Sequence, residues 1–300
     1  MGIAPRIRIR AHAKINLTLR VRGIRDDGYH ELETVFQSLA LHDDVTCALR
    51  PGPFSLRCDD AGVPTDERNL IWRAAQHLWQ TTGRRGSVRG VEIVLAKQIP
   101  MQAGLGGGSS DAAAALVALS RLWAVGPRIN LTAVAAEIGA DVPYFLTGGT
   151  ALGLSRGDDL YPLPDLPPYQ VVLGLPGFGV STAEAFGWFD RAQATHRQPP
   201  AAEAPSISAW PGRPLTVFNA LEAPVVARHA EIGAVRDMLV RSGARAASMT
   251  GSGSAVFGLF DAEPPARRAA HVLASHDLVA ILTRTADRRS CLGAARRLAR

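Results

Sequence analysis

Residues typical of secreted, metal-binding and membrane-spanning proteins are scarce in this sequence. The only three cysteines, Cys47, Cys58 and Cys291, match no metal-site spacing and leave one without a disulfide partner, which favours a reduced compartment. No apolar run reaches the roughly 18 residues of a membrane span, because the alanine-rich stretch after Asp111 is soon broken by Arg121. We therefore expect a cytoplasmic protein with no membrane partner.

Lysine is also scarce. Only Lys14 and Lys97 are lysines among the 33 basic residues, and arginine supplies the rest. A compact ammonium can occupy sites where a planar guanidinium does not fit. The two lysines are therefore either functional or chance survivors of a strong arginine bias, and this observation alone favours neither interpretation.

The net charge of +6 suits either nucleic acid or a phosphorylated small molecule. The sequence has no aromatic RNA-binding signature, and its one dense basic cluster is the C-terminal stretch RTADRRSCLGAARRLAR. We expect a small-molecule substrate, no nucleic-acid partner, and either a monomer or a homodimer. An RNA-associated protein is the alternative from another functional class.

Strand and helix patterns alternate in both halves of the chain, which indicates an α/β or α+β protein. In the first half we expect strands over 6–12 and 14–22 and a helix that begins near residue 110. Four prolines in 160–169 predict a linker. Beyond it we expect a Pro/Ala-rich loop over 198–214 and one helix over about 222–242. The predicted units are an N-terminal domain over 1–160, a C-terminal domain over 168–285 and a basic tail over 286–300.

The stretch PMQAGLGGGSSDAAAAL, Pro100 to Leu116, concentrates four glycines in front of the predicted helix. It is not a Walker A loop, because no lysine follows the glycines. It also departs from the dinucleotide-binding pattern, since Ser109 stands at the third glycine position and no acidic residue follows about 20 residues later.

The glycine-rich stretch nevertheless has the chemistry of a phosphate-binding loop. Without Cβ atoms, backbone N–H groups can surround an anion, and the positive end of the following helix points at the same place. Ser109 and Ser110 would cap that helix or donate to phosphate oxygens. A flexible serine-capped turn is the alternative, but four glycines exceed what a turn requires.

Five stretches resemble the GHMP kinases. GLGGGSSDAA resembles the phosphate-binding motif of that family, AHAKINLTL (11–19) its N-terminal element and TGSGSAVF (250–257) its third motif. DDGYHELETVFQSL (26–39) and GADVPYFLTGGTALGLSRGD (139–158) resemble one branch, whose substrate is a cytidine diphosphate derivative of methylerythritol. The resemblance spans roughly residues 8–260.

This resemblance implies an α+β fold of two domains, a ribosomal-protein-S5-like N-terminal domain and a ferredoxin-like C-terminal domain, with the active site in the cleft between them. It implies an ATP-dependent kinase that phosphorylates the 2-hydroxyl of that cytidine substrate in isoprenoid precursor biosynthesis. A kinase of mevalonate or homoserine is the alternative within the family. The stretch DGYHELETVFQ argues against it, because its aromatic residues suit a bound cytosine.

By resemblance, the catalytic residues are Asp141 and Lys14. Asp141 would accept the hydroxyl proton, while Lys14 would favour the ionised carboxylate and stabilise charge on the transferring phosphoryl group. From the residues alone, Asp141 would equally suit the N-cap of a helix that starts at Val142. Lys14 would equally suit an edge-strand charge.

The resemblance also implies the residues that bind the cytidine substrate. Tyr29 would stack on the cytosine and His30 would hydrogen-bond its edge. Phe186 would form the other aromatic wall, although a phenylalanine on a helix is more often part of a core. Asn16 either binds substrate or bridges strands, and Thr182 is a weaker candidate for a pyrimidine or phosphate contact.

For the nucleotide, Lys97 would contact the purine or phosphate side, and Asn69 either caps a helix or contacts ATP. Mg²⁺ would bridge the β- and γ-phosphates. Octahedral Mg²⁺ keeps mostly water and phosphate oxygens as ligands, so we assign it no protein ligand, although Ser110 or Asp111 and Asp141 are candidates. The predicted ATP-binding residues are Pro100, Met101, Gln102, Ala103, Gly104, Leu105, Gly106, Gly107, Gly108, Ser109, Ser110 and Lys97.

Overall fold

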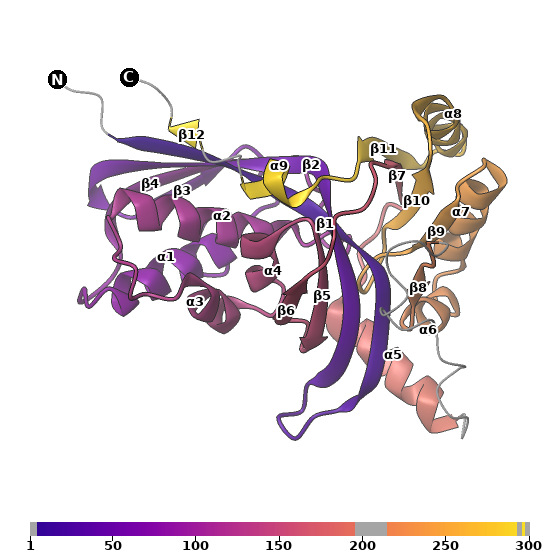
Figure 1. Ribbon diagram of the computed structural model, residues 1–300, viewed down its shortest axis with the longest axis horizontal. Coiled ribbons are helices and arrows are strands. Elements are labelled where there is room, and N and C mark those ends of the chain that lie inside the picture. The colour runs from indigo at the N-terminus through magenta and orange to yellow at the C-terminus, as the bar shows by residue number, and fades with distance from the viewer. Residues whose placement is uncertain (1–4, 196–214, 293–295, 298–300) are drawn as a thin grey trace.

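The computed structural model describes residues 5–195, 215–292 and 296–297, which form two sheets covered by helices (Figure 1). The predicted loop over 198–214 lies outside the described residues. The first sheet contains β1 (Arg6–Ile24), β2 (His30–Pro53), β3 (Ser55–Cys58), β4 (Arg89–Ala96), β5 (Thr150–Ser155), β6 (Asp159–Pro162), β8 (Phe218–Asn219) and β12 (Arg296–Arg297). The second contains β7 (Gln170–Leu175), β9 (Ala246–Met249), β10 (Val256–Phe260) and β11 (Val279–Arg284). The helices are α1 (Leu70–Thr81), α2 (Gly107–Leu122), α3 (Leu131–Ile138), α4 (Val142–Thr147), α5 (Thr182–Thr195), α6 (Glu222–Val226), α7 (Ala230–Arg241), α8 (Glu263–Ala274) and α9 (Arg288–Leu292).

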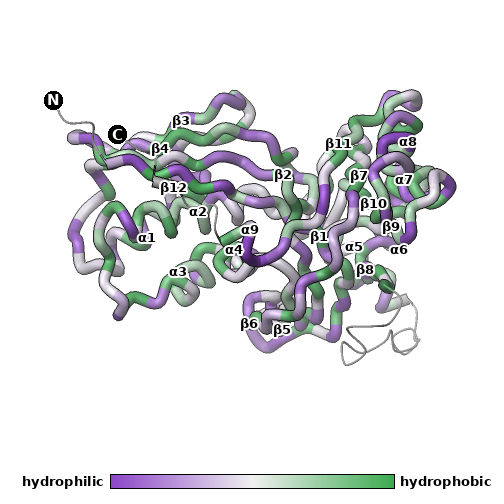
Figure 2. Tube along the Cα trace, turned by 45° about the horizontal axis from the view of Figure 1, so that its top comes forward, coloured by the Kyte–Doolittle hydropathy of each residue, from purple (hydrophilic) through white to green (hydrophobic). Residues whose placement is uncertain are grey.

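The first sheet is built on the long antiparallel pair β1 and β2, in the order β12-β1-β2-β4-β3. At the start of β1, Ile7, Ile9 and Ala11 are buried while the arginines between them are exposed, as the two-residue period of a strand requires. This alternation can be followed in Figure 2. Helices α1 to α4 lie on one side of this sheet and bury the apolar core against it.

The strands predicted over 6–12 and 14–22 are one continuous strand, β1. Its pairing with β2 shifts register between His12 and Lys14 and again between Asn16 and Thr18. Every residue from Ala11 to Leu17 is buried, so alternation does not reveal the strand there. Such irregularities redirect side chains, and here they bracket Lys14 and Asn16.

The second sheet has the order β11-β7-β10-β9 and packs against α5 to α8. The prediction of one helix over 222–242 is wrong, because the chain forms α6 and α7 with a break before His229. The His229 ring lies 4.8 Å from the Phe178 ring and 5.5 Å from the Trp188 ring, measured between centroids. His229 has the non-helical dihedrals φ −133° and ψ 79°. This tertiary packing accompanies the break in the helical periodicity.

After β11 the chain returns to the first sheet. Leu39 and Thr285 form an isolated bridge, and β12 pairs with β1. In α9, the Arg288 guanidinium donates to the Thr150 carbonyl at 2.6 Å, and the Arg288 backbone N–H donates to Asp165 at 3.0 Å. Residues 286–292 and 296–297 are therefore attached to the N-terminal half, and the domain boundaries given above stay predictions.

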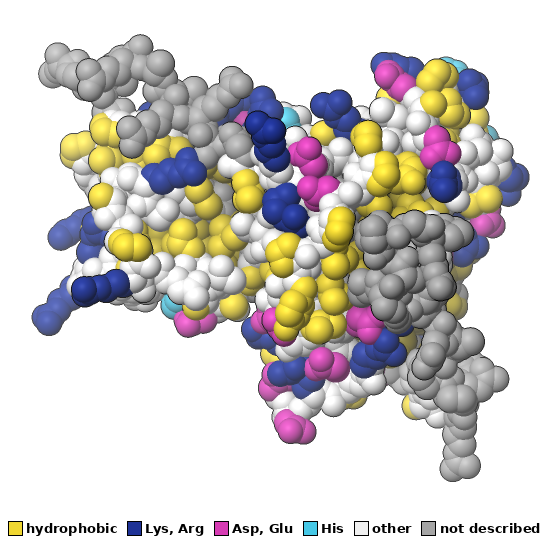
Figure 3. Space-filling model, in the orientation of Figure 1, with side chains coloured by type: hydrophobic (Ala, Val, Ile, Leu, Met, Phe, Trp, Pro, Cys, Tyr) yellow, Lys and Arg dark blue, Asp and Glu magenta, His cyan; other side chains and the backbone are white. Residues whose placement is uncertain are grey.

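The surface has no single dominant charge on the face shown in Figure 3. Lys and Arg side chains are dispersed there among Asp and Glu. In the part of the chain that the structure describes, no helix is both long enough and apolar enough to cross a membrane.

Candidate active site

A cavity of about 1180 Å³ is lined by residues from both halves of the chain. The lining includes residues of β1, β2, the glycine loop and the start of α4, together with the segments around residues 63–70 and 156–157. The second half contributes residues 179–184, Phe186, Leu221 and residues 251–252. Every predicted catalytic, substrate-binding and ATP-binding residue lines this cavity except Ser110. The tertiary structure thus brings together side chains that are far apart in the sequence.

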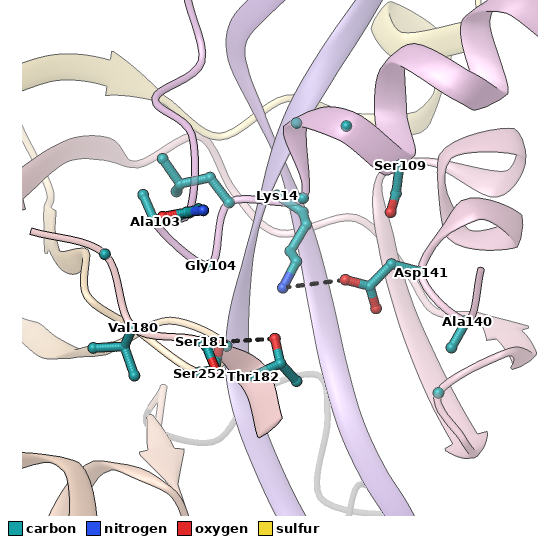
Figure 4. Close-up of a pocket in the computed structure, with 18 of the residues that line it drawn as sticks. Lys14, Ala103, Gly104, Ser109, Ala140, Asp141, Val180, Ser181, Thr182 and Ser252 are labelled. Carbon is teal, nitrogen blue, oxygen red and sulfur yellow. Dashed lines mark hydrogen bonds and ion pairs between the residues drawn. The ribbon is translucent and has the colours of Figure 1, made fainter. Parts of the chain in front are cut away.

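Lys14 and Asp141 face each other across the cavity, with Nζ 3.8 Å from the nearer carboxylate oxygen (Figure 4). The Lys14 side chain is 4% exposed, whereas that of Asp141 is 38% exposed. Burial lowers the pKa of Lys14, and the charge of Asp141 opposes this shift only in part. Lys14 is therefore a desolvated ammonium beside a carboxylate that a ligand in the cavity can reach.

The alternative role of Asp141 as a helix cap is wrong. Asp141 occupies the N-cap position of α4, but its backbone is helical, with φ −80° and ψ −16°, and its side chain makes no capping hydrogen bond. A capping side chain normally requires an extended backbone at this position. The carboxylate is left free to face Lys14.

Asn16 fixes the Lys14 ammonium. Lys14 Nζ donates to Asn16 Oδ1 at 2.6 Å, and Asn16 Nδ2 donates to Thr34 Oγ1 at 2.7 Å. Asn16 therefore bridges β1 and β2, as one of the two interpretations predicts. It also lines the cavity, and its contact with substrate stays a prediction.

The glycine loop leads into α2 three residues earlier than predicted. Gly106 is the N-cap, with φ 71°, and no side chain caps the helix. Gly107 and Gly108 form its first turn, although glycine is a poor helix former, and serine capping is wrong. The first N–H groups of a helix have no partner within it, so the amides at the start of α2 are available to an anion.

Ser109 and Ser110 differ in position. Ser109 lines the cavity and lies on the Asp141 side of it in Figure 4. Ser110 is buried and is not among the residues that line the cavity. This position gives no support to a direct phosphate or magnesium contact of Ser110.

The TGSGS turn (250–254) packs directly on the glycine loop. Thr250 Oγ1 accepts the Asn16 backbone N–H at 3.0 Å, and the Ala255 N–H donates to the Ala103 carbonyl at 3.3 Å. A Cβ on Gly104 would lie 2.2 Å from the Thr250 carbonyl oxygen. Thr250 was not among the predicted site residues, although its place in the third family motif was a usable signal.

We expect Gly106→Ala to destabilise the protein by more than about 1–2 kcal/mol, the cost of a left-handed non-glycine residue, and to weaken ATP binding. A Cβ there would lie 2.6 Å from Phe145 Cζ and 3.1 Å from Lys14 Cγ. Urea unfolding and titration with a non-hydrolysable ATP analogue measure the two effects. Gly83→Ala is the control, because Gly83 has φ 80° and open space around its Cβ position. Equal stability losses in the two variants would contradict the packing argument.

The predicted cytosine-binding residues gather where the end of the β1–β2 hairpin meets α5. The His30 and Phe186 rings are stacked with centroids 4.4 Å apart, and His30 Nε2 lies 2.8 Å from Asp190 Oδ1. Tyr29 is 56% exposed, with the Arg156 guanidinium 5.3 Å from its ring centroid. Asp190 carried no sequence signal that marked it as part of this group, whereas Arg156 lies within the stretch 139–158 that resembles the family.

Thr182 and Ser252 border the cavity from the second half of the chain. Their hydroxyl oxygens lie 3.2 Å apart (Figure 4). This contact joins the start of α5 to the TGSGS turn. A contact between Thr182 and a ligand stays a prediction.

Lys97 lines the cavity, but its ammonium is already paired. It donates to Asp43 and, at 3.1 Å, to Asp111. Although burial alone lowers the pKa of Lys97, the charges of Asp111 and Asp43 outweigh burial and raise it. The predicted nucleotide contact of Lys97 stays a prediction. Asn69 caps α1, because its side chain accepts the Ile71 N–H at 2.9 Å, and it also borders the cavity.

Two carboxylates at the cavity fit a hard divalent cation. Asp141 is partly exposed, and Asp111 has one carboxylate oxygen, Oδ1, with no hydrogen-bond partner among the described residues. Mg²⁺ prefers oxygen ligands and takes many of them from water and phosphate. Across the described ranges, no cluster of three or more His, Cys, Asp or Glu is arranged to hold a metal.

Comparison with known proteins gives a consistent picture. Residues 69–149 match the N-terminal domain of GHMP kinases, and residues 207–277 match the C-terminal domain. A 4-diphosphocytidyl-2-C-methyl-D-erythritol kinase from Pelotomaculum thermopropionicum is 44% identical over 92% of this chain and 96% of its own. The enzyme of the same name from Deinococcus radiodurans is 40% identical over 88% of this chain and 87% of its own.

Solved structures agree with these relatives. A crystal structure of 4-(cytidine 5'-diphospho)-2C-methyl-D-erythritol kinase has a TM-score of 0.76 and 36% identity, covering 93% of this chain and 98% of its own. A homoserine kinase from Cytophaga hutchinsonii has a TM-score of 0.66 at 19% identity, covering 97% of both chains. The second similarity shows a shared fold alone.

Proposed function

Because the chain belongs to the GHMP kinases and, within them, to the 4-diphosphocytidyl-2-C-methyl-D-erythritol kinases, we propose that Lys14 and Asp141 form its reaction centre. The chain is an ATP-dependent kinase of that cytidine substrate in isoprenoid biosynthesis. Its fold is the two-domain α+β fold of this family. The observation that carries our proposal is the 3.8 Å approach of Lys14 Nζ to Asp141 in a cavity bordered by the glycine loop.

In the proposed reaction, the 2-hydroxyl oxygen of the substrate attacks the γ-phosphorus of ATP. The bond from that phosphorus to the β,γ-bridging oxygen breaks, and ADP leaves. Asp141 accepts the hydroxyl proton, and the Lys14 ammonium stabilises the negative charge of the transferring group. Asn16 holds that ammonium in place through its 2.6 Å hydrogen bond.

ATP is proposed to bind along residues 100–109, with its phosphates at the start of α2. The uncapped amides and the helix dipole favour an anion at this point. Mg²⁺, when bound with ATP, neutralises charge on the β- and γ-phosphates. Asp141 and Asp111 are the residues that would hold it, directly or through water.

The cytosine is proposed to bind beside Tyr29, His30 and Phe186. An aromatic ring and a base gain roughly 1–3 kcal/mol by stacking, and His30 offers a ring nitrogen besides the one that faces Asp190. The remaining assignments, a cytoplasmic location, no nucleic-acid partner and a monomer or homodimer, are also proposals.

A coupled assay of ADP release tests the substrate assignment. We expect turnover with 4-diphosphocytidyl-2-C-methyl-D-erythritol and none above background with mevalonate or homoserine. Phosphorus NMR of the product should place the new phosphate on the 2-hydroxyl. Equal or faster turnover with mevalonate or homoserine would contradict the assignment.

A further inference from the structure

Asp43 is a fully buried carboxylate in β2 that has no role in the proposed reaction. Its Oδ1 accepts the backbone N–H groups of Gln98 and, at 2.8 Å, Ile99. Its Oδ2 accepts from the Lys97 ammonium. All three donors belong to the segment 97–99, which immediately precedes the glycine loop.

Lys97 also links Asp43 to α2, the helix that follows the glycine loop. Its Nζ lies 3.1 Å from Asp111 in α2, and a Cβ on Gly107 would lie only 2.9 Å from it. The ammonium therefore lies directly against the first turn of α2. Asp43, Lys97 and Asp111, which we call the loop anchor, join β2 to the segments before and after the glycines.

A loop anchor of this kind is an inefficient way to stabilise a fold. Burying charged groups costs several kcal/mol each, and apolar residues of similar volume often serve stability equally well. Burial and the neighbouring Asp43 charge raise the pKa of Asp111, while Lys97 opposes that rise. The charged side chains of the loop anchor form directional hydrogen bonds, and those bonds hold the backbone amides of Gln98 and Ile99 at defined positions.

We propose that Asp43 is a positioning residue that sets the geometry of the ATP phosphate site through Lys97, Gln98 and Ile99. This inference rests on the proposed function, in which the glycine loop binds ATP. Asp43 is not among the residues that line the cavity, so it acts on the nucleotide only through this segment. None of the predicted cytidine-binding residues belongs to the segment 97–99, and His30, which shares β2 with Asp43, lies 13 residues earlier in that strand, so they should be unaffected.

Asp43→Asn tests the inference, with Asp44→Asn as the matched control. Asp44 is the next residue of β2 and binds the Arg8 side chain, with Arg8 Nε 2.8 Å from its Oδ1. Calorimetric titration should give Asp43→Asn a dissociation constant for a non-hydrolysable ATP analogue roughly 10- to 100-fold above that of the unmodified protein, the scale of a misplaced binding group. The KM of Asp43→Asn for the cytidine substrate should change by less than about twofold, the scale of a peripheral substitution. In Asp44→Asn, both the dissociation constant for the ATP analogue and this KM should change by less than about twofold.

If Asp43→Asn does not fold, a double variant, Asp43→Asn with Lys97→Met, can be tested in its place. It removes one charge of each sign, so the net charge of the loop anchor is unchanged, while Asp111 loses its ammonium partner. Hydrogen exchange should show faster exchange at residues 98–110 than in the unmodified protein, together with weakened analogue binding. Because Lys97 itself lines the cavity, weakened binding supports the inference only together with the faster exchange. Analogue binding within about twofold of the unmodified protein, in whichever of the two variants folds, would overturn the inference. If the unmodified protein itself binds no analogue, the proposed function fails instead.

Discussion

Asp141→Asn should lower kcat at least about 100-fold, the usual scale for loss of a general base, and leave the affinity for an ATP analogue nearly unchanged. The amide preserves the size of the side chain but cannot accept the hydroxyl proton as the carboxylate does. Single-turnover kinetics and isothermal titration measure the two quantities separately.

The structure also allows a prediction about stability, because the Asp141 side chain does not cap α4. The substitution removes no helix cap, so the thermal unfolding midpoint should change only by what the loss of the ion pair with Lys14 costs, and the protein should stay folded. Asp237→Asn is a suitable control, since that carboxylate is half exposed on α7 and pairs with Arg236 at 2.9 Å. Equal losses of binding and rate in Asp141→Asn would indicate a structural role.

Lys14→Ala should lower kcat by roughly 100- to 1,000-fold, the effect of removing one transition-state charge donor, and Lys14→Arg should not restore it. The space around the side chain is limited, because a Cβ on Gly106 would already lie 3.1 Å from Lys14 Cγ. A planar guanidinium cannot take the ammonium's place beside both Asn16 and Asp141. Steady-state kinetics of the two variants, with exposed Arg10→Ala as control, test this point.

The pH dependence of kcat/KM gives a second measurement on Lys14. Burial lowers its pKa below the ordinary value of 10.5, and the Asp141 charge only partly compensates. The charged ammonium is the active form, so kcat/KM, which reports the free enzyme, should fall as the pH rises through this lowered pKa. A rate that stays constant up to the ordinary lysine pKa would contradict the role of Lys14, as would near-normal activity of Lys14→Arg.

The sequence by itself determined which residue types and local elements the candidate site contains. Glycine-rich loops, turn signals and helix periodicity depend on local backbone preferences, so the glycine loop and the α2 helix that follows it were predictable. The start of α2 was misplaced by three residues, because Gly107 and Gly108 adopt helical geometry despite their poor propensity. The scarcity of lysine drew attention to Lys14 before any partner for it was known.

Only the tertiary structure decided which of these parts act on one another. The bulged β1 strand directs Lys14 toward Asp141 at the start of α4, and Asp43 reaches from β2 to the segment before the glycine loop. Local preferences cannot specify such pairs, because the partners are distant in sequence and meet only when the sheets and helices bury their apolar faces together. The helix break that includes His229 is accompanied by packing of the same kind, since its ring lies against the Phe178 and Trp188 rings.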